Sequence, residues 1–179
     1  MTESFRLIPL EEAHDLKNGG KANNLAKLIN LGLTVPPGLV LDLEQNQIGA
    51  ETLAQVSQQV FTTLHPPLIV RSSVNIEDSR LTSFAGMFTS FYPLQTREDL
   101  TNALAKTYSH EQSTEVLAYL KHYNIRVEQL SQTAIIQEYR AAKLAGVIFT
   151  TDPQDSARMI IEFSTQPSGV MSGQVTPHS

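Results

Sequence analysis

Two proline pairs, Pro36-Pro37 and Pro66-Pro67, limit how long any regular element can be in the first half of the chain. Proline has no backbone N–H and disfavours helical geometry in the residue before it, so a helix must end ahead of each pair. Apolar residues recur at three- and four-residue spacing before both pairs, which predicts helices over about residues 21–31 and 50–64. Gly32 follows the first helix, at a position where glycine commonly ends one. The chain must therefore fold into short elements that pack together.

The second half of the chain predicts two further helices. Thr96 and Asp99 have the spacing of a reciprocal helix cap, which predicts a helix that runs through Tyr108. Another helix is expected near residues 113–123. Three apolar residues of that helix are expected to face the core: Val116, Leu117 and Leu120.

Apolar and alternating runs predict four short strands, at residues 68–70, 133–139, 145–150 and 158–163. In the last of these, Met159 and Phe163 alternate with Ile160 and Glu162, which is typical of a half-exposed strand. Helices and strands do not alternate regularly along the chain. The order therefore favours an α+β domain over a doubly wound parallel sheet.

Charge and residue usage exclude several classes of function. The 179 residues include 13 basic and 18 acidic side chains, a net charge of −5, which argues against a general binder of nucleic acid or anionic membrane. Cysteine is absent, so disulfides, thiol nucleophiles and cysteine-bound zinc are excluded. No apolar run approaches the ~20 residues that span a bilayer, and the first residues do not have the pattern of a signal peptide. We expect a soluble, cytoplasmic protein.

The first segment that could carry chemistry runs from Asn18 to Leu25, directly into the first predicted helix. Gly19 and Gly20 let the backbone approach a ligand closely, and the N–H groups at a helix start favour an anion. Lys21 adds a mobile cation. The alternative is an ordinary glycine turn with a solvated lysine, because the spacing is not that of the common phosphate loop.

A second segment, Arg71-Ser72-Ser73, is predicted to come directly after the strand at residues 68–70. The planar guanidinium of an arginine that leaves a buried strand suits phosphate or carboxylate, and the two hydroxyl groups could assist. The alternative is an arginine at a sheet edge that pairs with Glu77 or Asp78.

A third segment, from Ser83 to Phe91, places Gly86 between small and aromatic residues, with hydroxyl groups at Ser83 and Ser90. Such a pattern favours a loop that folds over a ligand. The alternative is a β-turn anchored in the core by its phenylalanines.

Taken together, five segments occur in an informative order. They are Gly19-Gly20-Lys21-Ala22-Asn23-Asn24-Leu25; Gly32-Leu33-Thr34-Val35-Pro36-Pro37-Gly38; Arg71-Ser72-Ser73 with Glu77-Asp78 and Ser83-Phe84-Ala85-Gly86; Gln137 with Ala145 through Pro153; and Ile161-Glu162 with Ser172-Gly173-Gln174-Val175-Thr176-Pro177. In their order and in their residues they resemble the N-terminal nucleotide-binding domain of the phosphoenolpyruvate synthase and pyruvate phosphate dikinase family, which has an ATP-grasp fold. The resemblance implies a shortened ATP-grasp-like domain over residues 1–179, with two small lobes at about 1–95 and 96–179 as an alternative.

The resemblance also implies roles for individual residues. Lys21 and Arg71 would hold the ATP phosphates and carry the catalytic role, and Gly86 with Ser90 would belong to a loop that closes over them. Residues 137–139 would border the adenine: Gln137, Glu138 and Tyr139. In the family, Mg²⁺ accompanies the nucleotide, and ATP phosphorylates a histidine on a separate domain.

The chain departs from the family in three places. The region at residues 38–68 is short, and Gln166-Pro167-Ser168 stands where the family has a glycine-rich loop with an acid. The chain stops at Ser179, ahead of the family's magnesium ligands and catalytic arginine. Glu162 is the one candidate for a metal ligand.

We therefore expect the ATP-binding part of a phosphotransferase that is inactive on its own. ATP and Mg²⁺ are the expected cofactors. A second subunit or domain with the phosphohistidine, or a second copy of the chain, is the expected partner. Two alternatives remain: a non-catalytic nucleotide-sensing module, and an interaction or scaffold protein of the same fold.

Overall fold

The computed structural model describes residues 5–43, 48–75, 90–110, 113–127, 130–152 and 154–165. The chain divides into two compact units, Met1–Tyr139 and Arg140–Ser179, which are described separately below. The division lies between Tyr139 and Arg140. The expected single domain, with its alternative lobe boundary near residue 95, stays a prediction.

The first unit is built on one five-stranded sheet in the order β1-β2-β5-β3-β4. Its strands are β1 (Phe5–Pro9), β2 (Gly38–Leu43), β3 (Leu68–Val74), β4 (Phe91–Leu94) and β5 (Gln132–Glu138). Every neighbouring pair in the sheet is antiparallel. The central strand β5 is buried along its whole length, because it has a strand on each side and helices over both faces. This mixture of helices with an antiparallel sheet confirms the α+β prediction.

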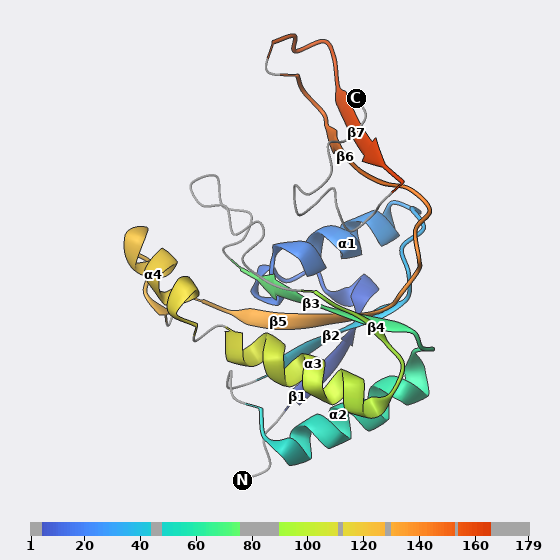
Figure 1. Ribbon diagram of the computed structural model, residues 1–179, viewed down its shortest axis with the longest axis vertical. Helices are drawn as coiled ribbons and strands as arrows, with labels where there is room; N and C mark the ends of the chain where they lie inside the picture. The colour runs from blue at the N-terminus through green and yellow to red at the C-terminus, as the bar shows by residue number, and fades with distance from the viewer. Residues whose placement is uncertain are drawn as a thin grey trace. The chain divides into compact units, whose positions relative to one another are not determined.

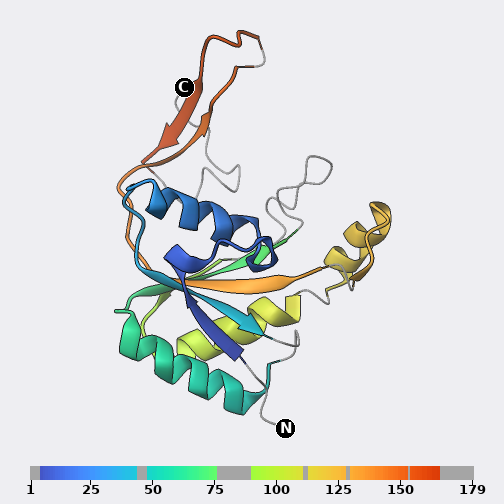
Figure 2. The ribbon, with the colours of Figure 1, turned by 180° about the vertical axis from the view of Figure 1, so that it is seen from behind.

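Helices cover the two faces of this sheet unequally. Helices α2 (Ala50–Thr63) and α3 (Arg97–His110) pack on one face, and α1 (Gly20–Asn30) packs on the other, as Figures 1 and 2 show from opposite sides. Two short 3₁₀ turns, Leu10–Glu12 and Leu16–Asn18, precede α1 on its face. Helix α4 (Thr114–His122) lies beyond the end of the sheet.

Each face has its own apolar core. The larger core joins α2 and α3 to the sheet through buried residues that include Leu53, Val56, Val60, Leu68, Val70, Leu100, Leu104 and Ile136. The smaller core lies under α1 and consists of Leu10, Ala13, Ala22, Ala26, Val40 and Ile135. A third cluster, Val74, Val116, Leu120 and Leu130, attaches α4.

The predicted helix ends are confirmed. Gly32 has φ 80°, and the N–H of Leu33 donates to the carbonyl of Leu28 at 3.0 Å, the bond that closes a Schellman C-cap. The N–H of Asp99 donates to Thr96 Oγ1 at 3.1 Å, and Asp99 Oδ2 accepts the N–H of Thr96 at 2.9 Å. The hydroxyl of Thr96, with the N–H groups beside it, lowers the pKa of the Asp99 carboxyl.

Three features of the first unit correct the sequence predictions. The strand predicted at residues 68–70 runs to Val74, so Arg71, Ser72 and Ser73 belong to β3 rather than follow it. Strands β1, β2 and β4 were not predicted. Leu117, which was expected to face the core, is 41% exposed.

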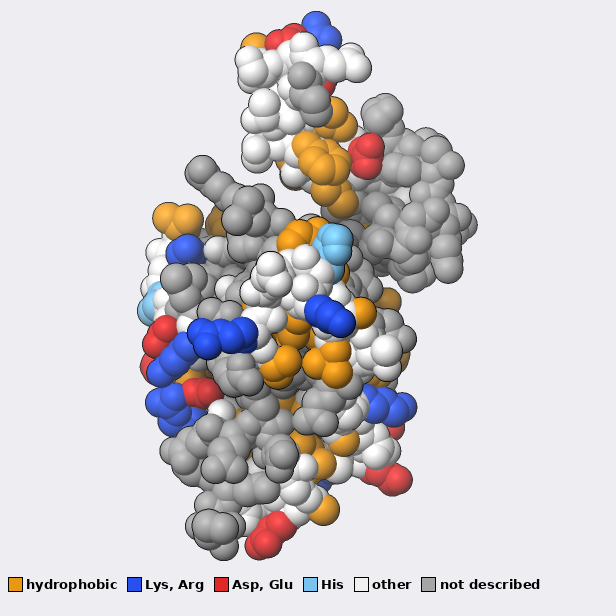
Figure 3. Space-filling view, turned by 90° about the vertical axis from the view of Figure 1, so that its left-hand side faces the viewer, with side chains coloured by type: hydrophobic (Ala, Val, Ile, Leu, Met, Phe, Trp, Pro, Cys, Tyr) orange, Lys and Arg blue, Asp and Glu red, His pale blue; other side chains and the backbone are white. Residues whose placement is uncertain are grey.

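The second unit contains a two-stranded antiparallel hairpin of β6 (Ala145–Phe149) and β7 (Ile160–Ser164). Ile148 lies opposite Ile161, and Gly146 lies opposite Phe163. Hydrophobic side chains form a band along the hairpin (Figure 3). Met159 and Phe163 are exposed whereas Ile160 and Glu162 are half-buried, as the alternation predicted.

No helix within the described ranges has both the length and the apolar character that a membrane span requires.

Candidate functional site

The start of α1 lies directly against β3. The N–H of Ala22, in the first turn of the helix, donates to Ser73 Oγ at 3.1 Å in a buried position. Gly19, immediately before the helix, has φ 85°. A Cβ on Gly19 would lie 2.2 Å from Ser73 Oγ and 2.5 Å from the Ser73 carbonyl carbon. Only glycine fits this contact, because both the backbone angle and the space exclude a side chain.

The strand β5 binds the same turn from a second side. The hydroxyl of Thr133 donates to the carbonyl of Asn18 at 2.6 Å. The carbonyl of Ser73 lies 3.3 Å from the same hydroxyl oxygen. One residue outside the strand, the hydroxyl of Ser131 donates to the carbonyl of Lys17 at 3.0 Å. The turn that enters α1 is therefore bonded to both β3 and β5.

Lys21 and Arg71 come to the same face of the sheet. Side chains alternate between the faces of a strand, so Arg71 shares its face with Ser73, the residue that contacts α1. Arg71 pairs with Ile135, which belongs to the core under α1. Lys21 is the neighbour of Ala22 in the first turn of that helix. Both cations are half-buried.

Ser72 points to the opposite face. It pairs with Ala134, a member of the core beneath α2 and α3, and it is 3% exposed. The two hydroxyl groups that follow Arg71 therefore lie on opposite faces of the sheet. Only Ser73 lies on the face that carries Arg71.

The predicted adenine-bordering residues lie at the other end of β5. Gln137 is buried, and its Nε2 donates to the carbonyl of Pro36 at 3.0 Å. Thr133 and Gln137 are four residues apart in an extended strand, or about 13 Å. The same face of β5 thus contacts the turn before α1 through Thr133 at one end and carries Gln137 at the other end.

Polar groups of Glu138 and Tyr139 are used within the fold. Their backbone N–H groups donate to the carbonyls of Pro37 at 3.0 Å and Pro67 at 2.7 Å. Oε1 of the nearly buried Glu138 accepts the backbone N–H of His65 at 3.2 Å and lies 3.1 Å from His65 Nδ1. The ring of Tyr139 stacks on Tyr92, with centroids 5.0 Å apart. Contacts from these two residues to a base would therefore come from carbonyl oxygens or side chains.

The structure does not relate the remaining predicted site residues to Lys21 and Arg71. Gly86 lies outside the described residues, as do Glu77, Asp78 and residues 166–179. Ser90 is exposed ahead of β4. Glu162 lies in β7 opposite Val147, in the second unit, and the structure does not relate it to Lys21 or Arg71.

The described residues hold no complete metal site. Across those ranges, no three histidine, aspartate or glutamate side chains gather. Mg²⁺ that accompanies a nucleotide usually takes one or two carboxylates and completes its shell with phosphate oxygens and water. A single carboxylate such as Glu162 is compatible with that arrangement but not with a cage made of protein ligands alone.

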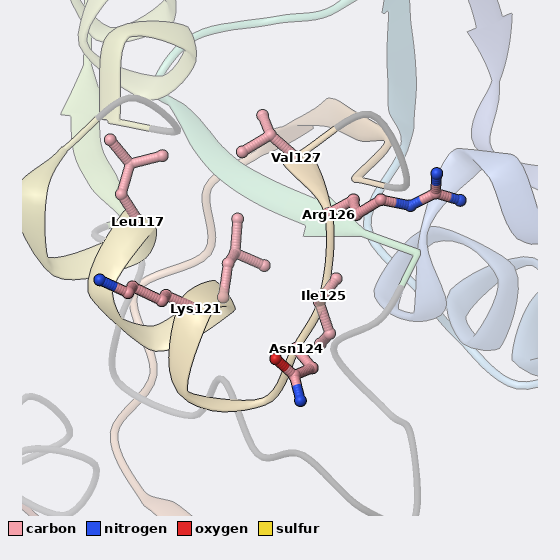
Figure 4. Close-up of a pocket in the computed structure, with 7 residues that line it drawn as sticks. Leu117, Lys121, Asn124, Ile125, Arg126 and Val127 are labelled. Atoms are coloured by element: carbon pink, nitrogen blue, oxygen red, sulfur yellow. The ribbon is translucent and has the colours of Figure 1, made fainter.

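An open cavity of about 460 Å³ lies elsewhere, at the end of α4 (Figure 4). It is lined by Leu117, Leu120, Lys121, Asn124, Ile125, Arg126 and Val127. None of the predicted site residues lines it, and Arg126 points away from Lys121. The partly exposed Leu117 forms part of its wall, which explains why the expected inward position of that residue is wrong.

Two residues of the candidate site carry contacts that the sequence did not suggest. Thr133 was assigned only to a strand, and Ser73 only to a general role beside Arg71. Their bonds to Asn18 and Ala22 join segments that are 115 and 51 residues apart. No local pattern signals such a contact.

Comparison with known proteins defines the class to which this fold belongs. A family described as "Pyruvate phosphate dikinase, AMP/ATP-binding domain" matches residues 42–179. The chain belongs to this family. The match includes Arg71 and all of β5 and begins after the first helix. The family description supports ATP as a ligand.

Three relatives match a larger share of the chain than the family does. An "Uncharacterized phosphotransferase YvkC" of Bacillus subtilis (strain 168) is 26% identical over 196 residues, 93% of this chain and 23% of the relative. A "Probable phosphoenolpyruvate synthase" of Methanothermobacter thermautotrophicus is 25% identical over 209 residues, 89% of this chain and 31% of the relative. Another protein of that name, from Staphylothermus marinus, is 23% identical over 212 residues, 89% of this chain and 25% of the relative. The chain thus spans about a quarter to a third of these relatives.

Proposed function

We propose that this chain binds ATP and positions its phosphates for transfer to a histidine on another domain or chain. The observation that supports the proposal is that the first turn of α1, which contains Lys21, packs on the face of the sheet that carries Arg71. A helix start favours phosphate through its N–H groups and its dipole. Arginine adds a planar, permanently charged group that can bind two phosphate oxygens at once.

Phosphoryl transfer suits such a site because the protein needs to contribute position and charge rather than a nucleophile. In the proposed complex, the Lys21 ammonium binds the phosphate chain from α1. The Arg71 guanidinium binds it from β3. Ser90 is the proposed hydroxyl donor to the phosphates, and Gly86, which lies outside the described residues, keeps the role expected from the sequence. Each of these groups reduces the repulsion that the chain of phosphates presents to an incoming nucleophile.

Mg²⁺ would neutralise phosphate charge when it is bound with the nucleotide. Glu162 is the proposed protein ligand. The described residues include no group of three metal-ligating side chains, so phosphate oxygens and water would complete the coordination.

The adenine is proposed to lie towards the far end of β5. The side chain of Gln137 is fixed there by its bond to Pro36. Tyr139 contributes an aromatic ring that is already stacked on Tyr92. A flat, apolar surface next to fixed polar atoms is what a purine base requires.

Titration calorimetry with Mg-ATP tests the proposal. The wild-type chain is compared with Lys21→Ala and Arg71→Ala, and Lys27→Ala serves as the matched control because it removes a lysine from the last turn of the same helix. We expect both site variants to bind at least about tenfold more weakly, which corresponds to ~1.4 kcal/mol, and the control to bind as the wild type does. Equal affinity in all four proteins would refute the assignment of Lys21 and Arg71. Absence of binding to the wild type at millimolar ATP would refute ATP binding by this chain.

A further inference from the structure

Helix α1 begins without a local capping side chain. The first turn of any α-helix has N–H groups with no carbonyl inside the helix to receive them, and a Ser, Thr, Asp or Asn at the N-cap commonly binds one of them. Here the N-cap is Gly19, which makes no side-chain cap. Ser73 Oγ takes the N–H of Ala22 instead, three residues after the N-cap, which is where an N-cap hydroxyl usually binds. Ser73 thus does the work of an N-cap from a distant strand.

This remote cap has a geometric consequence that a local cap lacks. A cap within the helix defines only where the helix begins. A cap from β3 also fixes where the helix lies, because the bond ties the first turn to the sheet. Ser73 is fully buried and lies two residues beyond Arg71 on the same face. The bond therefore helps to set where the first turn of α1, which contains Lys21, lies relative to Arg71 in β3.

Thr133, in β5, also holds the turn before α1 against the sheet. Its hydroxyl donates to the carbonyl of Asn18, the residue before Gly19, and lies near the carbonyl of Ser73. Thr133 is 1% exposed, so no water competes for these bonds. The contact of Gly19 with Ser73 leaves no space in which the turn could move towards β3.

We propose that Ser73 and Thr133 are positioning residues for phosphate binding: their hydroxyl groups hold the start of α1 on β3 and β5, and thereby hold Lys21 and Arg71 at the separation that one phosphate chain requires. Neither residue needs to touch the nucleotide. The inference rests on the proposed function, because it assigns the geometry of that same site.

The first test compares Ser73→Ala with Ser72→Ala. Both serines lie in β3 and are buried, but only Ser73 faces α1. Each variant is titrated with Mg-ATP, its unfolding by urea is measured, and the hydrogen exchange of the Ala22 amide is followed by NMR. We expect Ser73→Ala to bind ATP about five- to tenfold more weakly and to lose protection at Ala22. We expect Ser72→Ala to keep the wild-type affinity, whatever its loss of stability.

The second test uses Thr133, in case Ser73→Ala fails to fold. Thr133→Val keeps the shape of the side chain and removes the hydroxyl, whereas Thr133→Ser keeps the hydroxyl. We expect Thr133→Val to weaken ATP binding severalfold and Thr133→Ser to restore at least most of the affinity. A role in packing alone would not produce this pattern, since the valine variant retains the buried volume.

The outcomes separate the two proposals. Wild-type binding with equal affinities in Ser73→Ala and Ser72→Ala, or in Thr133→Val and Thr133→Ser, would overturn the positioning role and leave ATP binding intact. Failure of the wild type to bind ATP would overturn the proposed function and the positioning role with it.

Discussion

At the start of α3, Thr96 and Asp99 bind each other's backbone within one turn, whereas at the start of α1 the capping hydroxyl belongs to Ser73, 51 residues further along the chain. In each helix a side-chain hydroxyl thus accepts one N–H of the first turn. The α3 cap is exposed and consists of neighbours in the sequence. The α1 cap is buried, and its hydrogen bond joins a helix to a strand.

The difference shows how a fold can fix the position of one helix start relative to the sheet and leave another start tied only to its own neighbours. A local cap survives a shift of the helix, because both of its partners move together. A remote cap breaks when the helix shifts, so it couples the helix to the sheet. In this protein the remote cap occurs at the helix start beside the two cations of the proposed phosphate site, and the local cap occurs at a helix that contributes to the larger core.

The largest effect is expected from Gly19→Ala, with Gly32→Ala as the matched control. Both glycines have positive φ, 85° and 80°, so alanine is strained at either position. The strain is about 1–2 kcal/mol at the helix end of Gly32 and about 1–3 kcal/mol at Gly19, whose ψ of 159° lies in a region that essentially only glycine adopts. A Cβ at Gly32 meets nothing within 4 Å, whereas a Cβ at Gly19 overlaps Ser73. We expect urea unfolding to show a loss of about 1–2 kcal/mol for Gly32→Ala and of more than about 3 kcal/mol for Gly19→Ala.

The difference between the two alanine variants reports how closely α1 lies on β3, together with the larger backbone strain at Gly19. Equal losses of stability would mean that the turn can move away from Ser73 at no cost. The comparison between a remote and a local cap would then lose its physical basis.

A smaller effect is expected from Asp99→Asn at the local cap. The Thr96 hydroxyl and the N–H groups of Gln95 and Thr96 hold the pKa of the folded carboxyl below its ordinary value of 3.8. The charged form therefore stabilises the fold above that value, and the contribution disappears as the pH falls through the lower pKa of the folded state.

We expect the melting temperature of Asp99→Asn to be below that of the wild type near neutral pH, with a gap that narrows as the pH falls below about 3.8. Mg-ATP affinity should be unchanged, because α3 lies on the face of the sheet opposite α1. A constant gap across the whole pH range would contradict the charged cap, and a loss of ATP affinity would contradict the separation of the two faces.

Local patterns were sufficient to predict much of this structure. The apolar spacing of α1 and α2, the glycine that ends α1 and the reciprocal cap of α3 depend on residues within one or two turns, and all are confirmed. The order of the elements was sufficient to exclude a doubly wound sheet.

Features that depend on distant partners could not be predicted in this way. Strand β2 was missed because its run, Gly38–Leu43, is buried almost throughout and shows no alternation. The true length of β3 follows from its pairing with β5, where Val74 lies opposite Gln132. The roles of Ser73 and Thr133 arise only when that pairing brings them to the start of α1.

The most direct test of the account follows backbone amide NMR signals as Mg-ATP is added to the wild-type chain. Binding between α1 and β3 predicts the largest shifts at residues 19–22 and 71–73, and no comparable change at the start of α3 or at the cavity beside α4. Shifts concentrated at residues 117–127, with residues 19–22 and 71–73 unchanged, would contradict the claim that Lys21 and Arg71 form the phosphate site.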